Sequence, residues 1–176
     1  MLFFPFRKII AVFFFFAWWV FLVSPAGAET EVLFSPEGVI KEHVLKEVES
    51  TTSTLDLAVH EITSSDMAQA FLKARERRVK VRIIADSRQA KMKSSKITYL
   101  IHQGILVKVL GGKGKELMNH RFAILDGKKV ITGSYDWSRP PESSSYENVL
   151  ILTDSEVVSS YQKEFDRLWR EKRIIQ

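Results

Sequence analysis

Seven polar side chains between residues 119 and 147 carry functional groups that can hold an anion and move protons. They are Asn119, His120, Arg121, Asp126, Ser134, Asp136 and Glu147. A histidine can act as a nucleophile or a general acid–base group, and a guanidinium and a hydroxyl can hold phosphoryl oxygens as charge develops. Carboxylates can orient such groups or form ion pairs with them. These residue types therefore suit the chemistry of phosphate esters.

The order Asn119-His120-Arg121 places neighbouring side chains on opposite faces of a strand. The apolar residues between Arg121 and Leu125 predict a strand, and side chains alternate between the two faces of a strand. Asn119 and Arg121 then share one face and His120 points to the other, unless a bulge re-aims it. We therefore expect His120 to be a structural or partly exposed histidine.

The spacing of these residues resembles the motif of the phospholipase D superfamily. That motif reads His-x-Lys, four residues, Asp, six residues, Gly-Ser-x-Asn, with a Glu some dozen residues later. With Asp126 as the motif aspartate, the other positions fall on Asn119 and Arg121, Gly133-Ser134, Asp136 and Glu147. If His120 is taken as the motif histidine instead, Asp126 and Gly133 each lie one residue closer to it than the motif requires. The spacing therefore excludes this alternative alignment.

Two upstream segments extend the resemblance to most of the chain. Phe34-Ser35-Pro36-Glu37-Gly38 and the stretch from Leu55 to Asp86 are similar to the single-motif branch of the family, which contains bacterial periplasmic endonucleases and mitochondrial cardiolipin hydrolases. The resemblance implies a phosphodiester partner, either nucleic acid or anionic phospholipid, and neither a metal nor another cofactor. It also implies a homodimer in which two histidines meet, one attacking phosphorus and the other protonating the leaving oxygen.

The chain departs from the family pattern at three positions. Asn119 replaces the nucleophilic histidine, and an amide is not a useful nucleophile. Arg121 replaces lysine, which keeps a charge suited to phosphate. Asp136 replaces asparagine, and two like charges about 4 Å apart repel by roughly 4 kcal/mol at an effective dielectric near 20. A phosphodiester is therefore repelled unless Asp136 is protonated, paired with Arg121 or turned aside. Glu147 is retained, but the histidine that it orients in the family is missing.

His60 offers an alternative source of an imidazole. It follows the predicted strand from Leu55 to Val59, at a position where the endonucleases have a tyrosine beside the site, and Glu61 follows it. His60 could serve as a relocated general acid or bind substrate. A metal cluster of Glu61, His60, Asp136 and Glu147 is conceivable, although these residues lack the spacing of a metal motif.

Three functions remain open. The first is a phosphodiesterase that hydrolyses nucleic acid or phospholipid through a histidine in an altered position, His120 or His60. The second is a catalytically inactive protein that binds phosphate-bearing ligands. The third is a dimeric interaction domain without a ligand.

The elements that must position these residues form an α/β pattern. Apolar runs predict seven strands, at residues 31–34, 55–59, 79–85, 105–110, 121–125, 129–131 and 148–152. Helical periodicity predicts helices around residues 40–48, 67–74, 94–102 and 155–170, with Val157, Tyr161, Phe165, Leu168 and Trp169 of the last helix inward. The expected fold is a phospholipase D-like mixed sheet of about seven strands with helices on both faces. Asp126-Gly127 equally well reads as a turn between two strands.

The N-terminus predicts a signal peptide. Arg7 and Lys8 precede fifteen apolar residues, Ile9 to Val23, and an Ala26-Gly27-Ala28 site. Cleavage after residue 28 leaves one domain, residues 29–176, that is exported to the periplasm or secreted. Membrane contact is expected only if the segment stays uncleaved as an anchor. The chain has no cysteine, which excludes disulfides and thiol chemistry.

The predicted mature chain is mildly basic. Removing Arg7 and Lys8 from 26 basic residues leaves 24 against 21 acidic ones, a net charge of about +3. Three basic clusters suit nucleic acid or an anionic headgroup, or simply a solvated surface. They are Lys73, Arg75, Arg77, Arg78, Lys80 and Arg82; Arg88, Lys91, Lys93 and Lys96; and Lys113 and Lys115.

Overall fold

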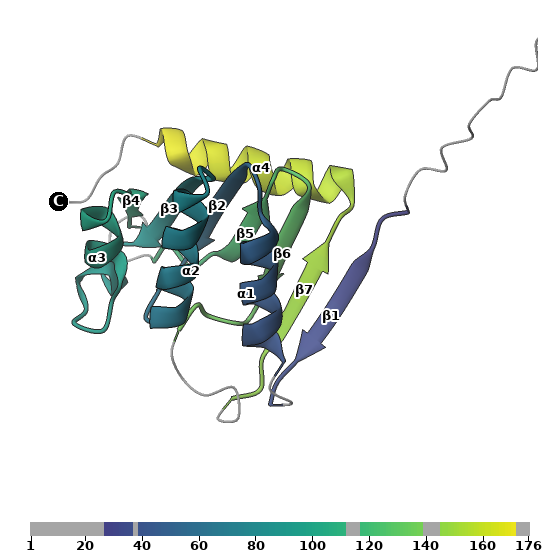
Figure 1. The fold of residues 1–176 in the computed structure, drawn as a ribbon, viewed down its shortest axis with the longest axis horizontal. Coiled ribbons are helices and arrows are strands. Elements are labelled where there is room, and N and C mark those ends of the chain that lie inside the picture. The colour runs from purple at the N-terminus through teal and green to yellow at the C-terminus, as the bar shows by residue number, and fades with distance from the viewer. Residues whose placement is uncertain (1–26, 37–38, 112–116, 139–144, 172–176) are drawn as a thin grey trace, which may run out of the picture.

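The computed structural model describes residues 27–36, 39–111, 117–138 and 145–171 (Figure 1). The predicted signal peptide lies almost wholly outside these ranges, and so do Lys113 and Lys115. In the part of the chain that is described, no helix is both long and apolar enough to span a membrane.

The centre of the fold is a mixed sheet of seven strands in the order β1-β7-β6-β5-β2-β3-β4. The strands are β1 (Thr30–Phe34), β2 (Thr54–Val59), β3 (Lys80–Asp86), β4 (Leu106–Leu110), β5 (Arg121–Leu125), β6 (Lys129–Gly133) and β7 (Asn148–Leu152). Strands β2, β3 and β4 are parallel to one another, and the remaining neighbours are antiparallel. The predicted mixed sheet of about seven strands is confirmed.

Helices cover both faces of this sheet (Figure 1). They are α1 (Ile40–Ser50), α2 (Ser65–Glu76), α3 (Ile97–His102) and α4 (Ser155–Arg170), with a short 3₁₀ turn, η1 (Gln89–Lys91). Apolar side chains of α1, α2 and α3 pack with Leu55, Leu57 and Ile83 on one face. Phe165 and Leu168 of α4 pack with buried side chains on the other face. The third helix is shorter than predicted, because residues 92–96 form a bend that precedes it.

Helix α4 begins after an aspartate, Asp154, that caps its N-terminus. The Asp154 carboxylate accepts from the backbone N–H groups of Glu156 (3.0 Å) and Val157 (2.9 Å), which satisfies two of the amides at the helix start. The predicted inward face is confirmed for Phe165 and Leu168, but Val158 is buried in place of Val157. The helix is therefore rotated slightly from the predicted orientation.

Strand directions bring several segments to one edge of the sheet. Strands β2, β3 and β6 end at this edge, while β5 and β7 begin there. We call it the site edge, because His60 follows β2, Ser134 follows β6, Asn119 precedes β5 and Glu147 precedes β7. Four of the predicted site residues, in addition to Arg121, thus come from four different segments.

Candidate phosphodiester site

Arg121 and Asp136 form an ion pair at the site edge. The Nε–H of Arg121 donates to Oδ1 of Asp136 at 2.7 Å, and each side chain is about three quarters buried, with 27% and 24% exposed. This is one of the three arrangements that the sequence left open for Asp136. Only Nε is used, and the terminal Nη groups of Arg121 have no partner among the described residues. These groups can still donate to a phosphoryl oxygen.

Ser134 and Glu147 are joined by a hydrogen bond in which the Ser134 hydroxyl donates to Oε2 of Glu147. Ser134 Oγ also accepts from the backbone N–H of Asn148 at 3.0 Å. Ser35, whose side chain is almost fully buried, fixes the segment before Glu147. Its hydroxyl accepts from the Glu147 N–H (2.8 Å) and donates to the Ser145 carbonyl (2.7 Å). The sequence motif did not identify Ser35 as a positioning residue, although it lies in the upstream segment that resembles the family.

Gly133 lets β6 approach the start of β7. A Cβ at this position would lie 2.1 Å from the carbonyl oxygen of Asn148, and its φ of +156° is unfavourable for other residues. The N–H of Ser134 donates to that same carbonyl at 3.1 Å. The Gly-Ser pair is therefore required for the backbone geometry that places the Ser134 hydroxyl beside Glu147.

His120 faces away from Arg121, as the alternation of side chains predicted. Its Nε2 lies 3.3 Å from Oε1 of Glu164 on α4, and its ring packs edge-on against Phe122 at 5.4 Å between centroids. The hydrogen bond from Arg167 lowers the pKa of Glu164, and the contact with His120 adds to this effect. Asn119 is exposed on the site edge. No bulge brings His120 round to the side of Arg121.

His60 lies beside the segment that contains Asn119. Its Nδ1 is 3.3 Å from the carbonyl oxygen of Met118. The N–H of Met118 in turn donates to Asp86 at 2.9 Å, and Asp86 is fully buried at the end of β3. Asp86 also accepts from the N–H groups of the turn after β3. Asp86 was not among the predicted site residues, but an acidic residue that ends the buried run Val-Arg-Ile-Ile-Ala is a signal that could have identified it.

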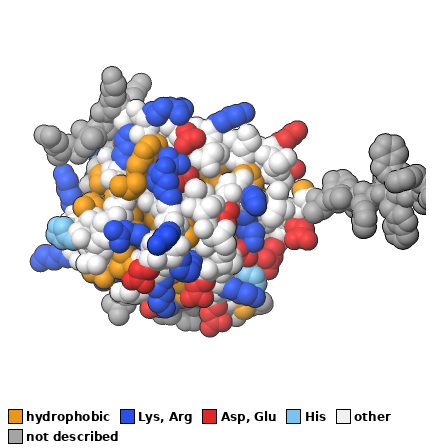
Figure 2. Space-filling view, turned by 45° about the horizontal axis from the view of Figure 1, so that its top comes forward, with side chains coloured by type: hydrophobic (Ala, Val, Ile, Leu, Met, Phe, Trp, Pro, Cys, Tyr) orange, Lys and Arg blue, Asp and Glu red, His pale blue; other side chains and the backbone are white. Residues whose placement is uncertain are grey.

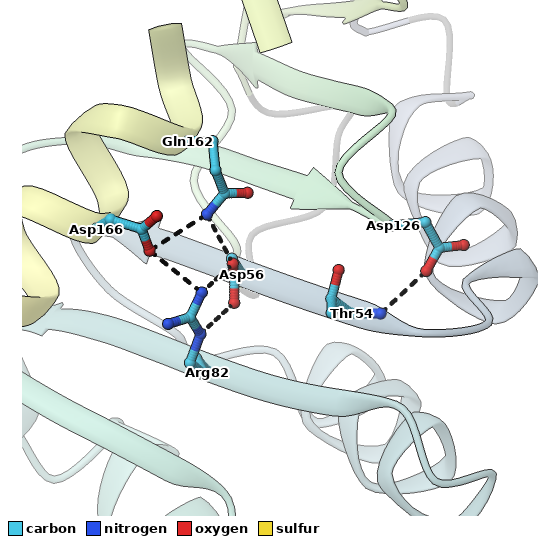
Figure 3. A network of polar contacts seen from close by, with 6 residues as sticks. All are labelled: Thr54, Asp56, Arg82, Asp126, Gln162 and Asp166. Carbon is cyan, nitrogen blue, oxygen red and sulfur yellow. Dashed lines mark hydrogen bonds and ion pairs between the residues drawn. The ribbon is translucent and has the colours of Figure 1, made fainter. Parts of the chain in front are cut away.

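Asp126 lies at the opposite edge of the sheet, roughly 17 Å along β5 from Arg121 at about 3.3 Å per residue. Its carboxylate accepts from the N–H groups of Ser53 (2.7 Å), Thr52 (3.0 Å) and Thr54 (3.0 Å), the last of which is drawn in Figure 3. Partial burial alone raises the pKa of Asp126, but these hydrogen bonds outweigh it and hold the pKa well below its usual range. The structure thus separates Asp126 from the other predicted catalytic residues. The alternative prediction of a turn is confirmed, because Asp126 and Gly127 both have positive φ.

Arg82 is not part of a surface for anions, contrary to the prediction that grouped it with a basic cluster. It forms a two-point pair with Asp56, at 2.7 Å and 2.6 Å, and Asp166 and Gln162 of α4 complete the network (Figure 3). The hydrogen bonds that Arg82 donates to Asp56 raise the pKa of Arg82. The guanidinium also lies 4.8 Å from the Phe165 ring centroid. Arg82 therefore holds α4 on the sheet.

The remaining basic residues are divided between the two sheet edges. Lys73, Arg75, Arg77, Arg78 and Lys80 lie at the end of α2 and the start of β3, away from the site edge. Arg88, Lys91, Lys93 and Lys96 follow β3 at the site edge. Figure 2 shows basic and acidic side chains interspersed over the visible face. A single continuous basic surface is therefore not seen on that face.

The described residues line a small space at the site edge. A space of about 10 Å³ lies beside Arg121, Tyr135 and Trp137, enough for about one water. A larger cavity, of about 420 Å³, lies near Lys128 and Lys163 and contains none of the predicted site residues. No three His, Asp or Glu side chains of the described residues are placed to hold a metal ion, so the hypothetical cluster around His60 and Glu147 does not form there.

Comparison with known proteins decides the family. The model of the cardiolipin synthase, PLD-like domain family matches residues 44–169, which include the segments that form the site edge from β2 to β7. The chain is a member of the phospholipase D superfamily. A phospholipase D family member, Nuc from Salmonella typhimurium, has the same fold, with a TM-score of 0.75, 22% identity, and coverage of 85% of this chain and 99% of Nuc.

Two curated relatives are named mitochondrial cardiolipin hydrolase. The protein from Chlamydomonas reinhardtii is 38% identical over 120 residues, covering 68% of this chain and 53% of its own. The protein from Xenopus laevis is 39% identical over 118 residues, covering 67% of this chain and 55% of its own. The chain therefore spans about half the length of these relatives.

These relatives contradict the predicted location. An exported protein, periplasmic or secreted, was expected from the basic and apolar N-terminus, but the names of both relatives place them in mitochondria. The prediction is wrong because basic residues near an apolar N-terminal stretch do not define one compartment. Leaders for mitochondria are also rich in basic residues and poor in acidic ones.

Proposed function

We propose that this chain recognises phosphodiesters at the site edge through Arg121 and Ser134, and that hydrolysis through a nucleophile at position 119 has been lost. The observation that carries the proposal is the Arg121–Asp136 pair. It compensates the carboxylate that replaces the family asparagine, and it leaves the terminal Nη groups of Arg121 without a partner among the described residues. The phosphate-binding part of the site can therefore act although Asn119 cannot attack phosphorus.

Charge balance limits the expected affinity. Arg121 pairs with Asp136, and Glu147 accepts from Ser134 at the same sheet edge, so Arg121, Asp136 and Glu147 sum to one negative charge when all are ionised. Lys91, Lys93 and Lys96 at the same sheet edge offset this charge over a longer range, an effect that salt weakens. We infer weak, salt-sensitive binding rather than a tight complex.

The ligand we propose is the phosphodiester group itself, in nucleic acid or in an anionic phospholipid. The relatives named cardiolipin hydrolase support the lipid. A homodimer that brings two site edges together, as the family resemblance implies, is part of the proposal.

A binding experiment tests the proposal. A fluorescent single-stranded oligonucleotide and cardiolipin-containing vesicles are titrated with the unmodified protein and with Arg121→Gln. We expect Arg121→Gln to weaken binding at least about tenfold, because a charge-assisted contact is lost. Lys128→Gln is the matched control, because Lys128 is exposed in the turn between β5 and β6, at the opposite edge of the sheet.

The two variants distinguish binding at the proposed site from general electrostatic attraction to a basic protein. If both weaken binding equally, the binding depends only on net charge and the proposed site is wrong. If neither probe binds to the unmodified protein at low salt, phosphodiester recognition is wrong, and the interaction domain without a ligand becomes the better account.

A further inference from the structure

His60 follows the last residue of β2 and lies beside the peptide group that precedes Asn119. Val59 pairs with Arg121 in the antiparallel ladder, so His60 lies at the end of that ladder. Its Nδ1 is 3.3 Å from the carbonyl oxygen of Met118, which belongs to the same peptide group as the backbone nitrogen of Asn119. The imidazole of His60 therefore lies against the peptide bond that precedes Asn119.

A second set of contacts ties the segment after His60 to the segment of Asp136. Ile62 forms a parallel bridge with Trp137. The N–H groups of Thr63 (3.2 Å) and Ser64 (3.3 Å) both donate to the Trp137 carbonyl. The backbone from His60 onward thus runs between the strand that carries Arg121 and the segment that follows Ser134. The imidazole therefore lies at the same sheet edge as the groups that we propose to hold the phosphodiester.

The contact with Met118 selects one form of the His60 ring. A carbonyl oxygen only accepts hydrogen bonds, so Nδ1 of His60 carries the hydrogen. In the neutral ring, Nε2 then has a lone pair. None of the described residues forms a hydrogen bond with Nε2, and the side chain is only partly buried. This tautomer, fixed at Nδ1 and open at Nε2, is the one that a general base requires.

In His120 it is Nε2, and not Nδ1, that has a partner among the described residues. Its Nε2 is occupied by Glu164, and its ring packs on Phe122 under α4, on the sheet face away from Arg121. The His120 ring thus contacts α4, whereas the His60 ring contacts the peptide group that precedes Asn119.

We propose that His60 is the acid–base residue of a slow hydrolysis at this site, a proposal that rests on the proposed phosphodiester recognition. A water molecule attacks phosphorus while Nε2 of His60 takes one proton from it. The new P–O bond forms as the bond from phosphorus to the leaving oxygen breaks. His60 then returns the proton to the leaving oxygen, so the reaction adds one water and yields a phosphomonoester and an alcohol. Neither a phosphohistidine nor a metal takes part.

The test measures cleavage of bis(4-nitrophenyl) phosphate and of a short oligonucleotide, in the presence of EDTA, by the full chain. We expect slow turnover by the unmodified protein. His60→Ala and His60→Asn should each lower it about 100-fold, the usual contribution of a general base. The asparagine keeps a donor for the Met118 carbonyl but has no base, so a loss in His60→Asn cannot come from the lost hydrogen bond. His102→Ala, on the exposed end of α3, is the matched histidine control and should be unchanged.

Several results would overturn the role of His60. These are no turnover by the unmodified protein, full turnover by His60→Asn, or a loss that appears in His120→Ala instead. Binding of the oligonucleotide is measured on the same samples. If binding persists without turnover, only the role of His60 fails; if binding is absent as well, the proposed function also fails. Thermal unfolding of each variant shows whether the fold is kept, and His60→Asn decides the question if His60→Ala is unfolded.

Discussion

The pairing of Arg121 with Asp136 sets the electrostatics of the site edge. Replacing Asp136 by asparagine removes one negative charge and frees Nε of Arg121. We expect Asp136→Asn to tighten binding of the fluorescent oligonucleotide about fivefold or more, which corresponds to roughly 1 kcal/mol for a partly exposed pair. Fluorescence anisotropy at low salt measures the change. Weaker binding by Asp136→Asn would mean that Asp136 orients Arg121 for the ligand instead of competing with it.

Asp126 is a residue whose role is stability. Asp126→Asn keeps a side chain that tolerates positive φ but weakens the hydrogen bonds from residues 52–54, so we expect a loss of about 1–3 kcal/mol in the free energy of unfolding at pH 7. The pKa of Asp126 is lowered in the folded state, so its contribution is present above about pH 4 and is lost as the pH falls below that value. Urea unfolding at several pH values should show the two proteins converging in acid. A constant difference at every pH would contradict this account.

Sequence reasoning succeeded at the residue scale where the period of a strand decides the outcome. The alternation of side chains along a strand placed His120 and Arg121 on different faces of the sheet, and the structure agrees. It failed for Asp126, because the motif spacing gives positions along the chain and not the sheet edge at which each residue falls. It also could not predict the Nδ1 contact of His60, since Met118 is 58 residues away in sequence.

The attachment of α4 to the sheet depends on the ion pair beneath it. Asp56 is only 3% exposed, and Arg82 is its two-point partner (Figure 3). We expect Arg82→Met to lower the free energy of unfolding by about 3–5 kcal/mol, because it leaves a buried carboxylate without its partner. Arg82→Met combined with Asp56→Leu should recover most of this loss. Chemical denaturation of the single and double variants measures the coupling, and equal losses in both would show that packing of Arg82 on Phe165 matters more than charge.

Strands and long helices were predictable because their apolar patterns are regular. The bounds of β5, β7 and α4 agree with the prediction, while the third helix was predicted to start too early. Residues 94–96 have no apolar face of their own, so only the tertiary structure determines that α3 begins at Ile97. The 3₁₀ turn η1 was not predicted for the same reason, as its three residues are too few to show a period.

At the scale of the whole molecule, the site edge exposes large apolar side chains. Tyr146 is 91% exposed, Phe34 59% and Leu117 42%, and each lies next to a segment of the site. Exposed apolar groups of this kind often mark an interface. We expect sedimentation of the unmodified protein to show a dimer, and Tyr146→Lys to shift it toward the monomer. A monomer at every concentration would contradict the predicted pairing of two site edges.

The central claim is that the frame of a phospholipase D site is preserved while its nucleophile is lost, and restoring the lost groups tests it most directly. Turnover of bis(4-nitrophenyl) phosphate is measured for the unmodified protein and for the double variant Asn119→His with Asp136→Asn. We predict a gain of at least about 100-fold, a conservative value beside the roughly millionfold effect of a catalytic nucleophile in a protease. If the double variant folds and binds the oligonucleotide but turns over no faster than the unmodified protein, the frame is not preserved and the account is wrong.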